Sequence, residues 1–442
     1  MAPTSPPAPS KGRAVPSGRF SRLASFGSMA SGVAGGMLVD GARQLATGKR
    51  PTMGDLLLTP ANALKVTQQL AHLRGAAMKL GQLMSMDGGE ILPPEMTEVL
   101  ARLRSDAEHM PQAQLHAALQ LRWGKHWKDR FSTFSEQPIA AASIGQVHRA
   151  TTRDGRDLAI KIQYPGVSHS IDSDINNVAS LLRLSGILPK TLDIAPMLNE
   201  AKRQLHEEAD YTREGACLER FATLLKDAPD YVVPAFHADL STPNMLAMSY
   251  VDGVPVDSMA GAPQEERNRI VRLLIELVLR ELFEFKLMQT DPNFANYQYD
   301  ATSKKLILLD FGATRSFTDE SVANYHRLMK AGLDVDTQAA RQAAMDIGFF
   351  DATTEPKHQT AVMEMFDMAM EPLRQDGPFD FGAPEVIARL RNAGMSLTQE
   401  RDFWHIPPMD TLFLQRKVGG IYLLASKLGA KINVRDLLTR HL

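Results

Sequence analysis

The 442-residue sequence contains a single cysteine, Cys217. One thiol cannot form an intramolecular disulfide or a cysteine cluster for zinc, so the composition fits a reducing compartment, either the cytoplasm or the mitochondrial matrix. An excess of either charge is also missing, because 49 Lys and Arg residues face 51 Asp and Glu residues. Without a basic surface to attract phosphates, we expect no nucleic-acid partner.

Long apolar runs are absent as well. Leu23–Val39 carries no charge, but it is rich in Gly, Ser and Ala and falls short of the ~20 strongly apolar residues that a span requires. Val418–Leu428 is too short and contains Lys427. We therefore expect peripheral attachment to an anionic membrane surface rather than a transmembrane helix. Basic residues suited to such a surface flank the first stretch: Arg22, Arg43, Lys49 and Arg50.

The N-terminal part of the chain divides into two predicted segments. Residues 1–50 begin with a basic stretch rich in Pro, Ser and Ala that cannot form a core, so we expect disorder there, with a mitochondrial transit peptide as the alternative. Residues 51–130 show helical periodicity and form a predicted helical extension. Lys79 and Gln82 are three residues apart in the segment Lys79-Leu-Gly-Gln82 and therefore share one helix face.

The segment Gln289-Thr-Asp-Pro-Asn-Phe-Ala-Asn296 has the spacing of a kinase catalytic loop, and Asp310-Phe-Gly312 follows it. In kinases an Asp of the loop accepts the proton of the acceptor, while an Asn and a second Asp hold Mg²⁺ against the ATP phosphates. The sequence therefore predicts Asp291 as the base and Asn296 and Asp310 as metal ligands. The residues between the two motifs, Tyr297–Leu309, are predicted to form a hairpin.

A second group of motifs predicts the nucleotide-binding half of a kinase. The octapeptide that begins at Ala140 and ends at Val147 takes the place of a Gly-rich phosphate loop, and Lys161 follows on an apolar strand as the partner of the α- and β-phosphates. Arg153-Asp-Gly155 is the predicted turn between them. The loop residues predicted to bind nucleotide are Ala140, Ala141, Ala142, Ser143, Gly145 and Val147.

A kinase also needs a Glu to pair with its strand lysine. Glu208 is our first candidate, and Glu207 or Glu214 could take its place. Farther along, the apolar strand Met245–Val251 is the predicted interlobe hinge, where Met248 and Tyr250 would lie against adenine. A long amphipathic helix is predicted to follow over Arg267–Met288.

Together these segments resemble the UbiB-type atypical kinase family, the coenzyme Q biosynthesis kinase-like proteins of bacteria and mitochondria, and within it the mitochondrial-type branch. The resemblance extends over roughly residues 60–435. It depends on five motifs in this order: Lys79-x-Gly-Gln82, Ala140–Val147, Ala159–Gly166, Glu208-x-Asp210 and Asp310–Arg315.

The resemblance implies an α+β, two-lobed, protein-kinase-like fold. Its N-lobe, with inserted helices, would occupy residues 131–252, and a mostly helical C-lobe would occupy residues 253–442. The helical extension would pack over the cleft, with Lys79 and Gln82 as a lid. The resemblance further implies Mg²⁺ and ATP as cofactors and a role in ubiquinone biosynthesis, with an isoprenoid quinone precursor or another lipid as substrate.

Two departures from ordinary kinases narrow this expectation. Gln289-Thr290 replaces the His-Arg pair before the catalytic Asp, so control through an activation-loop phosphate is not expected. No Ala-Pro-Glu motif lies between Asp310-Phe-Gly312 and the end of Ser321–Leu333, which reads as helix, and this leaves little room to dock a peptide. Phosphoryl transfer to proteins is therefore not expected.

Two functions stay open at this point. The first is an atypical kinase or ATPase that transfers phosphate to water or to a small lipid-like acceptor. The second is a nucleotide-gated binding protein for quinone precursors or for a biosynthetic complex. The expected partners are lipids, quinone-biosynthesis proteins, the membrane surface and a second copy of the chain. We expect a bacterial cytoplasmic protein at the inner membrane, or alternatively one on the matrix side of the mitochondrial inner membrane.

Overall fold

The computed structural model describes residues 109–184, 194–291, 293–383, 389 and 407–442. The predicted segment 1–50 and most of the predicted extension 51–130, including Lys79 and Gln82, lie outside these residues. The described residues divide into two compact units. The first unit contains residues 109–213 and Phe236–Tyr250, and the second contains Glu214–Ala235 and Val251–Leu442.

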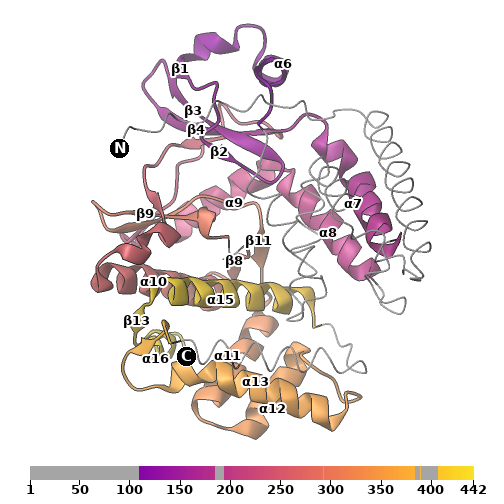
Figure 1. Cartoon of the computed structure of the whole chain (residues 1–442), viewed down its shortest axis with the longest axis vertical. Helices are drawn as coiled ribbons and strands as arrows, with labels where there is room; N and C mark the ends of the chain where they lie inside the picture. Colours follow the sequence, from indigo (N-terminus) through magenta and orange to yellow (C-terminus); the bar gives the residue numbers. More distant parts are fainter. Residues whose placement is uncertain (1–108, 185–193, 292, 384–388, 390–406) are drawn as a thin grey trace, which may run out of the picture. The chain divides into compact units, whose positions relative to one another are not determined.

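The first unit is built on a five-stranded antiparallel sheet (Figure 1). The strand order is β1-β3-β4-β6, and β2 pairs with β3. The strands are β1 (Phe131–Phe134), β2 (Ala140–Ala141), β3 (Gly145–Thr152), β4 (Asp157–Gln163) and β6 (Met245–Ser249). The helices are α6 (Gln112–Trp123), the short η1 (Trp127–Arg130), α7 (Val167–Leu184) and α8 (Ala195–Glu208). The helix α9 (Tyr211–Leu224) begins in the first unit and continues in the second.

The hairpin of β3 and β4 confirms the prediction made from Arg153-Asp-Gly155. Gly155 has a φ of 90°, which glycine adopts without steric cost, and its N–H donates to the carbonyl of Thr152. The turn sets the register in which Val147 lies opposite Lys161. The predicted strand at Met245 is also confirmed, since β6 pairs with β4 along its length.

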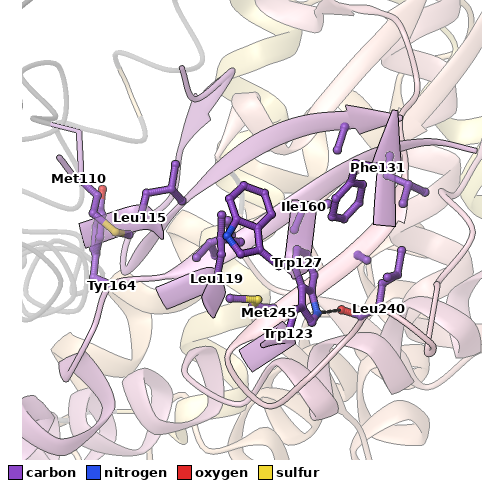
Figure 2. Packing of buried hydrophobic residues seen from close by; sticks show 14 residues of the cluster. Met110, Leu115, Leu119, Trp123, Trp127, Phe131, Ile160, Tyr164, Leu240 and Met245 are labelled. Carbon is purple, nitrogen blue, oxygen red and sulfur yellow. Dashed lines mark hydrogen bonds between the residues drawn. The ribbon is translucent and has the colours of Figure 1, made fainter. Parts of the chain in front are cut away.

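One face of this sheet is covered by a buried hydrophobic cluster (Figure 2). It is called the aromatic cluster below because it contains Trp123, Trp127, Phe131 and Tyr164. Trp123 at the end of α6 and Trp127 in η1 pack against strand residues such as Ile160. Burying an indole requires a partner for its N–H, and Trp123 Nε1 donates to the carbonyl of Leu240 over 3.1 Å. The cluster thus packs α6 against the sheet and buries this face of the sheet in the core.

The second unit is largely helical. Its helices are α10 (Gln264–Leu279), α11 (Asp319–Leu333), α12 (Thr337–Ile347), α13 (Pro356–Arg374), α15 (Met409–Leu428) and α16 (Val434–Thr439). Shorter helical turns are η2 (Val256–Gly261), η3 (Arg280–Glu284) and η4 (Phe294–Asn296). The strands are β5 (Tyr231–Val232), β7 (Val254–Pro255), β8 (Leu287–Gln289), β9 (Tyr297–Asp300), β10 (Lys305–Leu308), β11 (Thr314–Ser316), β12 (Phe379–Asp380) and β13 (Lys431–Ile432).

The predicted hairpin over Tyr297–Leu309 is confirmed, because β9 and β10 are antiparallel neighbours. The helix predicted over Arg267–Met288 is wrong at its C-terminal end. The α-helix ends at Leu279, a π-helical turn follows, and Met288 lies in β8, which pairs with β11. Lys286 has a φ of 51°, a left-handed conformation that a helix does not continue through.

The long helix α15 lies against α10 within this unit (Figure 1). It begins after Pro408 with Asp410 in its first turn, and it ends at Gly429, whose left-handed φ of 55° caps it. Its buried positions are apolar except for Thr411 and Lys417, and Lys417 is fully buried. A charged residue on the buried side of a helix requires partners from other elements.

Candidate functional site

The predicted nucleotide-binding strand residues lie on one face of the sheet of the first unit. Val147 on β3 is opposite Lys161 on β4, and Met248 on β6 is opposite Ala159, two residues before Lys161. Side chains two residues apart on a strand share a face, so Val147, Lys161 and Met248 point to the same side. The alternate residues, including Ile160 and Ile162, belong to the aromatic cluster on the other side.

Lys161 is buried at 8% exposure. Its Nζ lies over the ring of Tyr211, 5.1 Å from the centroid, in a cation–π arrangement. Tyr211 is fully buried at the N-terminus of α9. Because the ring cannot move far, it limits the directions in which the lysine side chain can extend. The sequence analysis did not identify Tyr211, although it directly follows the Glu208-x-Asp210 motif.

The alanine-rich loop is a tight hairpin. Ala140 and Ala141 form β2 and pair with Val147 and Gln146, and the N–H of Ala142 donates to the carbonyl of Gly145 over 2.9 Å. Within the described residues, none of the loop alanines has a positive φ. A Gly-rich conformation is therefore not needed at these positions.

Gly145 is required by a close contact of its own. A Cβ atom built there would lie 2.4 Å from the carbonyl oxygen of Ile162 and 2.9 Å from the hydroxyl of Tyr211. Any side chain at this position would push the loop away from β4 and from the tyrosine that faces Lys161. The retained glycine of the motif thus serves close packing.

The three acidic candidates near α8 and α9 differ in their surroundings. Glu207 pairs with Arg203 and Arg213 on the helix surface. Glu208 is the last residue of α8, and its carboxylate accepts a hydrogen bond of 2.9 Å from Ser143 of the alanine-rich loop. Glu214 lies in α9 and is buried at 1% exposure in the second unit. The pairing of Lys161 with Glu208 stays a prediction, as do the alternatives Glu207 and Glu214.

The predicted hinge lies at the edge of the same sheet. Met248 is buried, and the half-buried Tyr250 donates its backbone N–H to the carbonyl of Asp157 over 2.8 Å. The guanidinium of Arg149 stacks on the Tyr250 ring at 3.8 Å and also pairs with Asp157. The hydrogen bond to Arg149 lowers the pKa of that carboxyl. These contacts place Tyr250 firmly at the end of β6.

In the second unit, Asp291 and Asn296 contact each other directly. The amide nitrogen of Asn296 donates to Oδ2 of Asp291 over 3.2 Å. The other carboxylate oxygen of Asp291, Oδ1, is 3.2 Å from the guanidinium of Arg416 on α15. The predicted base is thus held on both sides, and one of its partners comes from a helix 125 residues farther along the chain.

Asp310 is tied to the same segment through the backbone. The N–H of Leu309 donates to the carbonyl of Asn296 over 3.1 Å, and Asp310 Oδ1 accepts from the N–H of Gly312 over 2.9 Å. Phe311 is buried against Phe221 of α9, with ring centroids 5.0 Å apart. The second unit therefore brings together all three residues predicted for the base and the metal.

The residues present fit a Mg²⁺ nucleotide. Among the described residues, no group of three or more His, Cys, Asp or Glu side chains could enclose a metal ion. Mg²⁺, however, usually takes one or two protein carboxylates together with water and substrate phosphates. Asp310 supplies a carboxylate, and Asn296 supplies an amide oxygen because its nitrogen faces Asp291. Both donors are oxygen atoms, as a hard cation requires.

The fold and these motifs define a protein of the kinase-like class. Residues 102–344 match the description "ABC1 atypical kinase-like domain". The chain belongs to this atypical kinase family, as the resemblance to UbiB-type proteins predicted. The prediction of a kinase-like enzyme with an α+β fold is confirmed with it.

Curated relatives support the assignment over nearly the whole chain. The chain is 40% identical to "Atypical kinase COQ8B, mitochondrial" of Rattus norvegicus over 97% of its length and 81% of that protein. It is 37% identical to "Atypical kinase COQ8, mitochondrial" of Saccharomyces cerevisiae over 97% of its length and 85% of that protein.

A solved structure has the same fold. The complex of Rv3197 with erythromycin from Mycobacterium tuberculosis has a TM-score of 0.60 and 23% identity, and it covers 85% of this chain and 94% of that one. Within the part of the chain that the structure describes, no helix combines the length and the apolar character needed to cross a membrane.

Proposed function

We propose that this chain, an atypical kinase of the COQ8 type that acts in coenzyme Q biosynthesis, transfers the terminal phosphoryl group of ATP to water or to a small lipid-like acceptor. One observation carries the proposal. Asp291 and Asn296 are hydrogen-bonded within a single segment, and the β9–β10 hairpin that follows leads directly to Asp310. A proton acceptor and two oxygen ligands are thereby grouped as phosphoryl transfer needs them.

Each residue has a proposed role. Lys161, oriented by Tyr211, binds the α- and β-phosphates. Asn296 and Asp310 hold Mg²⁺, and Asp291 accepts the proton of the attacking hydroxyl or water. Glu208 or Glu214 pairs with Lys161. When bound, ATP would supply the phosphoryl group, and Mg²⁺ would neutralise the negative charge that develops on the phosphates.

The short segment after the Asp-Phe-Gly motif supports a small acceptor. The strand β11 ends at Ser316, and α11 begins at Asp319 with Thr318 as its N-cap. Almost no chain is left between them to form the extended segment on which protein kinases dock peptides. We therefore propose an isoprenoid quinone precursor or a related lipid as acceptor, and not a protein.

A second function has an observation of its own in its favour. Both carboxylate oxygens of Asp291 are engaged, one by Arg416 and the other by Asn296. A carboxylate held in this way is well suited to maintaining the conformation of the segment. The alternative is a nucleotide-gated binding protein for quinone precursors, in which ATP acts as a conformational ligand.

Conversion of ATP to ADP by the purified chain, with and without isoprenoid lipid, separates the two functions, because ADP forms whether the phosphoryl group goes to water or to a lipid. An enzyme forms ADP in proportion to its concentration, and Asp291→Asn abolishes this turnover. A binding protein instead shows stabilisation by Mg²⁺ and ATP without ADP formation. Turnover that is the same in the parent and in Asp291→Asn would contradict the proposed role of this base.

The metal ligand can be tested by thermal denaturation. Saturating Mg²⁺ and ATP at 100 times the dissociation constant should stabilise the parent by about 2.7 kcal/mol. Asp310→Asn removes the anionic ligand and should abolish most of this stabilisation. An undiminished shift in the variant would exclude Asp310 as the metal ligand.

We further propose that the chain works at a membrane surface, alone or as a homodimer, together with other quinone-biosynthesis proteins. The basic residues near the N-terminus support contact with anionic lipid. The names of the relatives favour the mitochondrial alternative, and no comparison supports the bacterial cytoplasm. Cosedimentation of the full-length chain with cardiolipin-containing and neutral vesicles tests the membrane contact.

A further inference from the structure

Lys417 lies at the centre of a buried polar cluster in the second unit. Its Nζ donates to the carbonyl of Gln289 over 2.6 Å and to the hydroxyl of Tyr297 over 2.6 Å, and it lies 3.2 Å from Oε2 of Glu281. Lys417 and Glu281 are both almost completely buried. The N–H groups of the lysine thus meet acceptors on Gln289 and Tyr297, and the carboxylate of Glu281 lies beside the ammonium as its counter-ion.

These acceptors flank the predicted catalytic segment on both sides. Gln289 is the last residue of β8, two residues before Asp291, and Tyr297 is the first residue of β9, directly after Asn296. Glu281 extends the contact, because its Oε1 accepts from the backbone N–H of Gln289 over 3.2 Å. The cluster therefore connects both ends of the segment to α15.

The charges in the cluster support one another. Burial alone would lower the pKa of Lys417, but Glu281 and Tyr297 outweigh it and raise the pKa, so the ammonium stays charged. Burial raises the pKa of Glu281 against the attraction of Lys417. An ion pair in such a site is costly to form and still more costly to break on one side. If position 417 served only to pack α15 against the rest of the unit, an apolar residue such as leucine would be sufficient.

We infer that Lys417 is a positioning residue, which holds the segment carrying Asp291 and Asn296 in the geometry needed for phosphoryl transfer. The sequence lacks the His-Arg pair that precedes the catalytic Asp of ordinary kinases, and a lysine from α15 supports this segment instead. The next residue toward the N-terminus, Arg416, contacts Asp291 itself. The inference rests on the proposed function for its catalytic readout.

Three variants of the full-length chain separate positioning from stability. Lys417→Met breaks the pair and leaves Glu281 buried without its cationic partner. Glu281→Gln keeps the contacts of the lysine to Gln289 and Tyr297. The double variant Glu281→Gln with Lys417→Met restores charge balance but not the hydrogen bond to Gln289. Lys427→Met is the matched control, because this exposed lysine lies on the same helix and pairs with Asp257 on the surface.

Positioning predicts that the double variant regains thermal stability relative to Lys417→Met, while its kcat for ATP hydrolysis stays about 100-fold below the parent. The dissociation constant for ATP should change less than threefold in the same variant. Glu281→Gln and Lys427→Met should retain parental kcat. If the double variant recovers both stability and kcat, Lys417 is only a structural partner of Glu281 and the inference is wrong.

Hydrogen exchange decides the inference independently of turnover. The backbone amides of β8 and of η4 should exchange at least about tenfold faster in the double variant than in the parent, since the segment has lost its link to α15. Lys427→Met should show parental exchange. A parent without turnover would refute the proposed function alone, and unchanged exchange in the double variant would refute the inference.

Discussion

Replacing Gly145 by alanine is expected to destabilise the first unit and to weaken ATP binding. The added Cβ would lie 2.4 Å from the carbonyl oxygen of Ile162, which belongs to a strand paired on both edges and cannot retreat. It would also lie 2.9 Å from the hydroxyl of Tyr211, a fully buried side chain. Both separations are far below ordinary van der Waals contact, so the loop itself must move.

Overpacking of this kind costs about 1–3 kcal/mol. With a loss of about 2 kcal/mol, the melting temperature should fall by about 4–8 °C for a unit of this size. The displaced loop and tyrosine should also weaken the contact of Lys161 with nucleotide. Stabilisation by Mg²⁺ and ATP should therefore shrink together with the melting temperature.

Gly419→Ala in α15 is the matched control for this experiment. No heavy atom lies within 4 Å of a Cβ built at Gly419, and alanine in a helix interior should stabilise by about 0.5–1 kcal/mol. Differential scanning fluorimetry of both variants, with and without Mg²⁺ and ATP, is the assay. Parental melting temperature and parental ATP stabilisation in Gly145→Ala would refute the close-packing argument.

Three further predictions concern other parts of the chain. Burial lowers the pKa of His148 below its ordinary value of 6.5, so the buried neutral imidazole stabilises the fold fully above pH 6.5, and this stabilisation is lost as the pH falls through the folded-state pKa. The free energy of unfolding, measured by urea denaturation between pH 5 and pH 8, should rise with pH below the unfolded-state pKa by up to about 1.4 kcal/mol per pH unit. His148→Asn should flatten this slope. Trp123→Phe removes the hydrogen bond to the carbonyl of Leu240 and should cost about 1–3 kcal/mol in chemical denaturation; a change within the error of the parent would argue against that bond. Lys79→Ala and Gln82→Ala should alter ATP turnover or its response to lipid at unchanged stability if they form the predicted lid, and parental rates would favour a solvated helix face.

Local motifs were sufficient to predict the catalytic segment and both hairpins. A hairpin depends on a turn and two flanking strands, so Arg153-Asp-Gly155 and the run before Asp310 contain most of the information they need. The spacing of Asp291, Asn296 and Asp310 is also local information, since the residues between Asn296 and Asp310 form a single hairpin. The family followed from the order of such motifs along the chain.

The surroundings of the candidate residues were decided by the tertiary structure. Glu207, Glu208 and Glu214 look alike in sequence, but the first lies among surface arginines, the second bonds to Ser143 and the third is buried. Helical periodicity could not distinguish them, because α8 ends at Glu208 and a separate helix, α9, begins at Tyr211. Glu214 therefore does not continue the helical face of Glu207 and Glu208. Burial depends on the elements that pack against a helix as well as on its own sequence.

The amino-acid sequence by itself determined the kinase-like class, and it predicts the roles of Lys161, Asp291, Asn296 and Asp310, because each belongs to a short continuous motif. The end of α10 and the role of Lys417 were decided only by the tertiary structure. The first depends on the pairing of β8 with β11, and the second on contacts with Gln289, 128 residues away in the chain. A buried lysine has no local signature, since its partners are brought to it only when distant elements pack together.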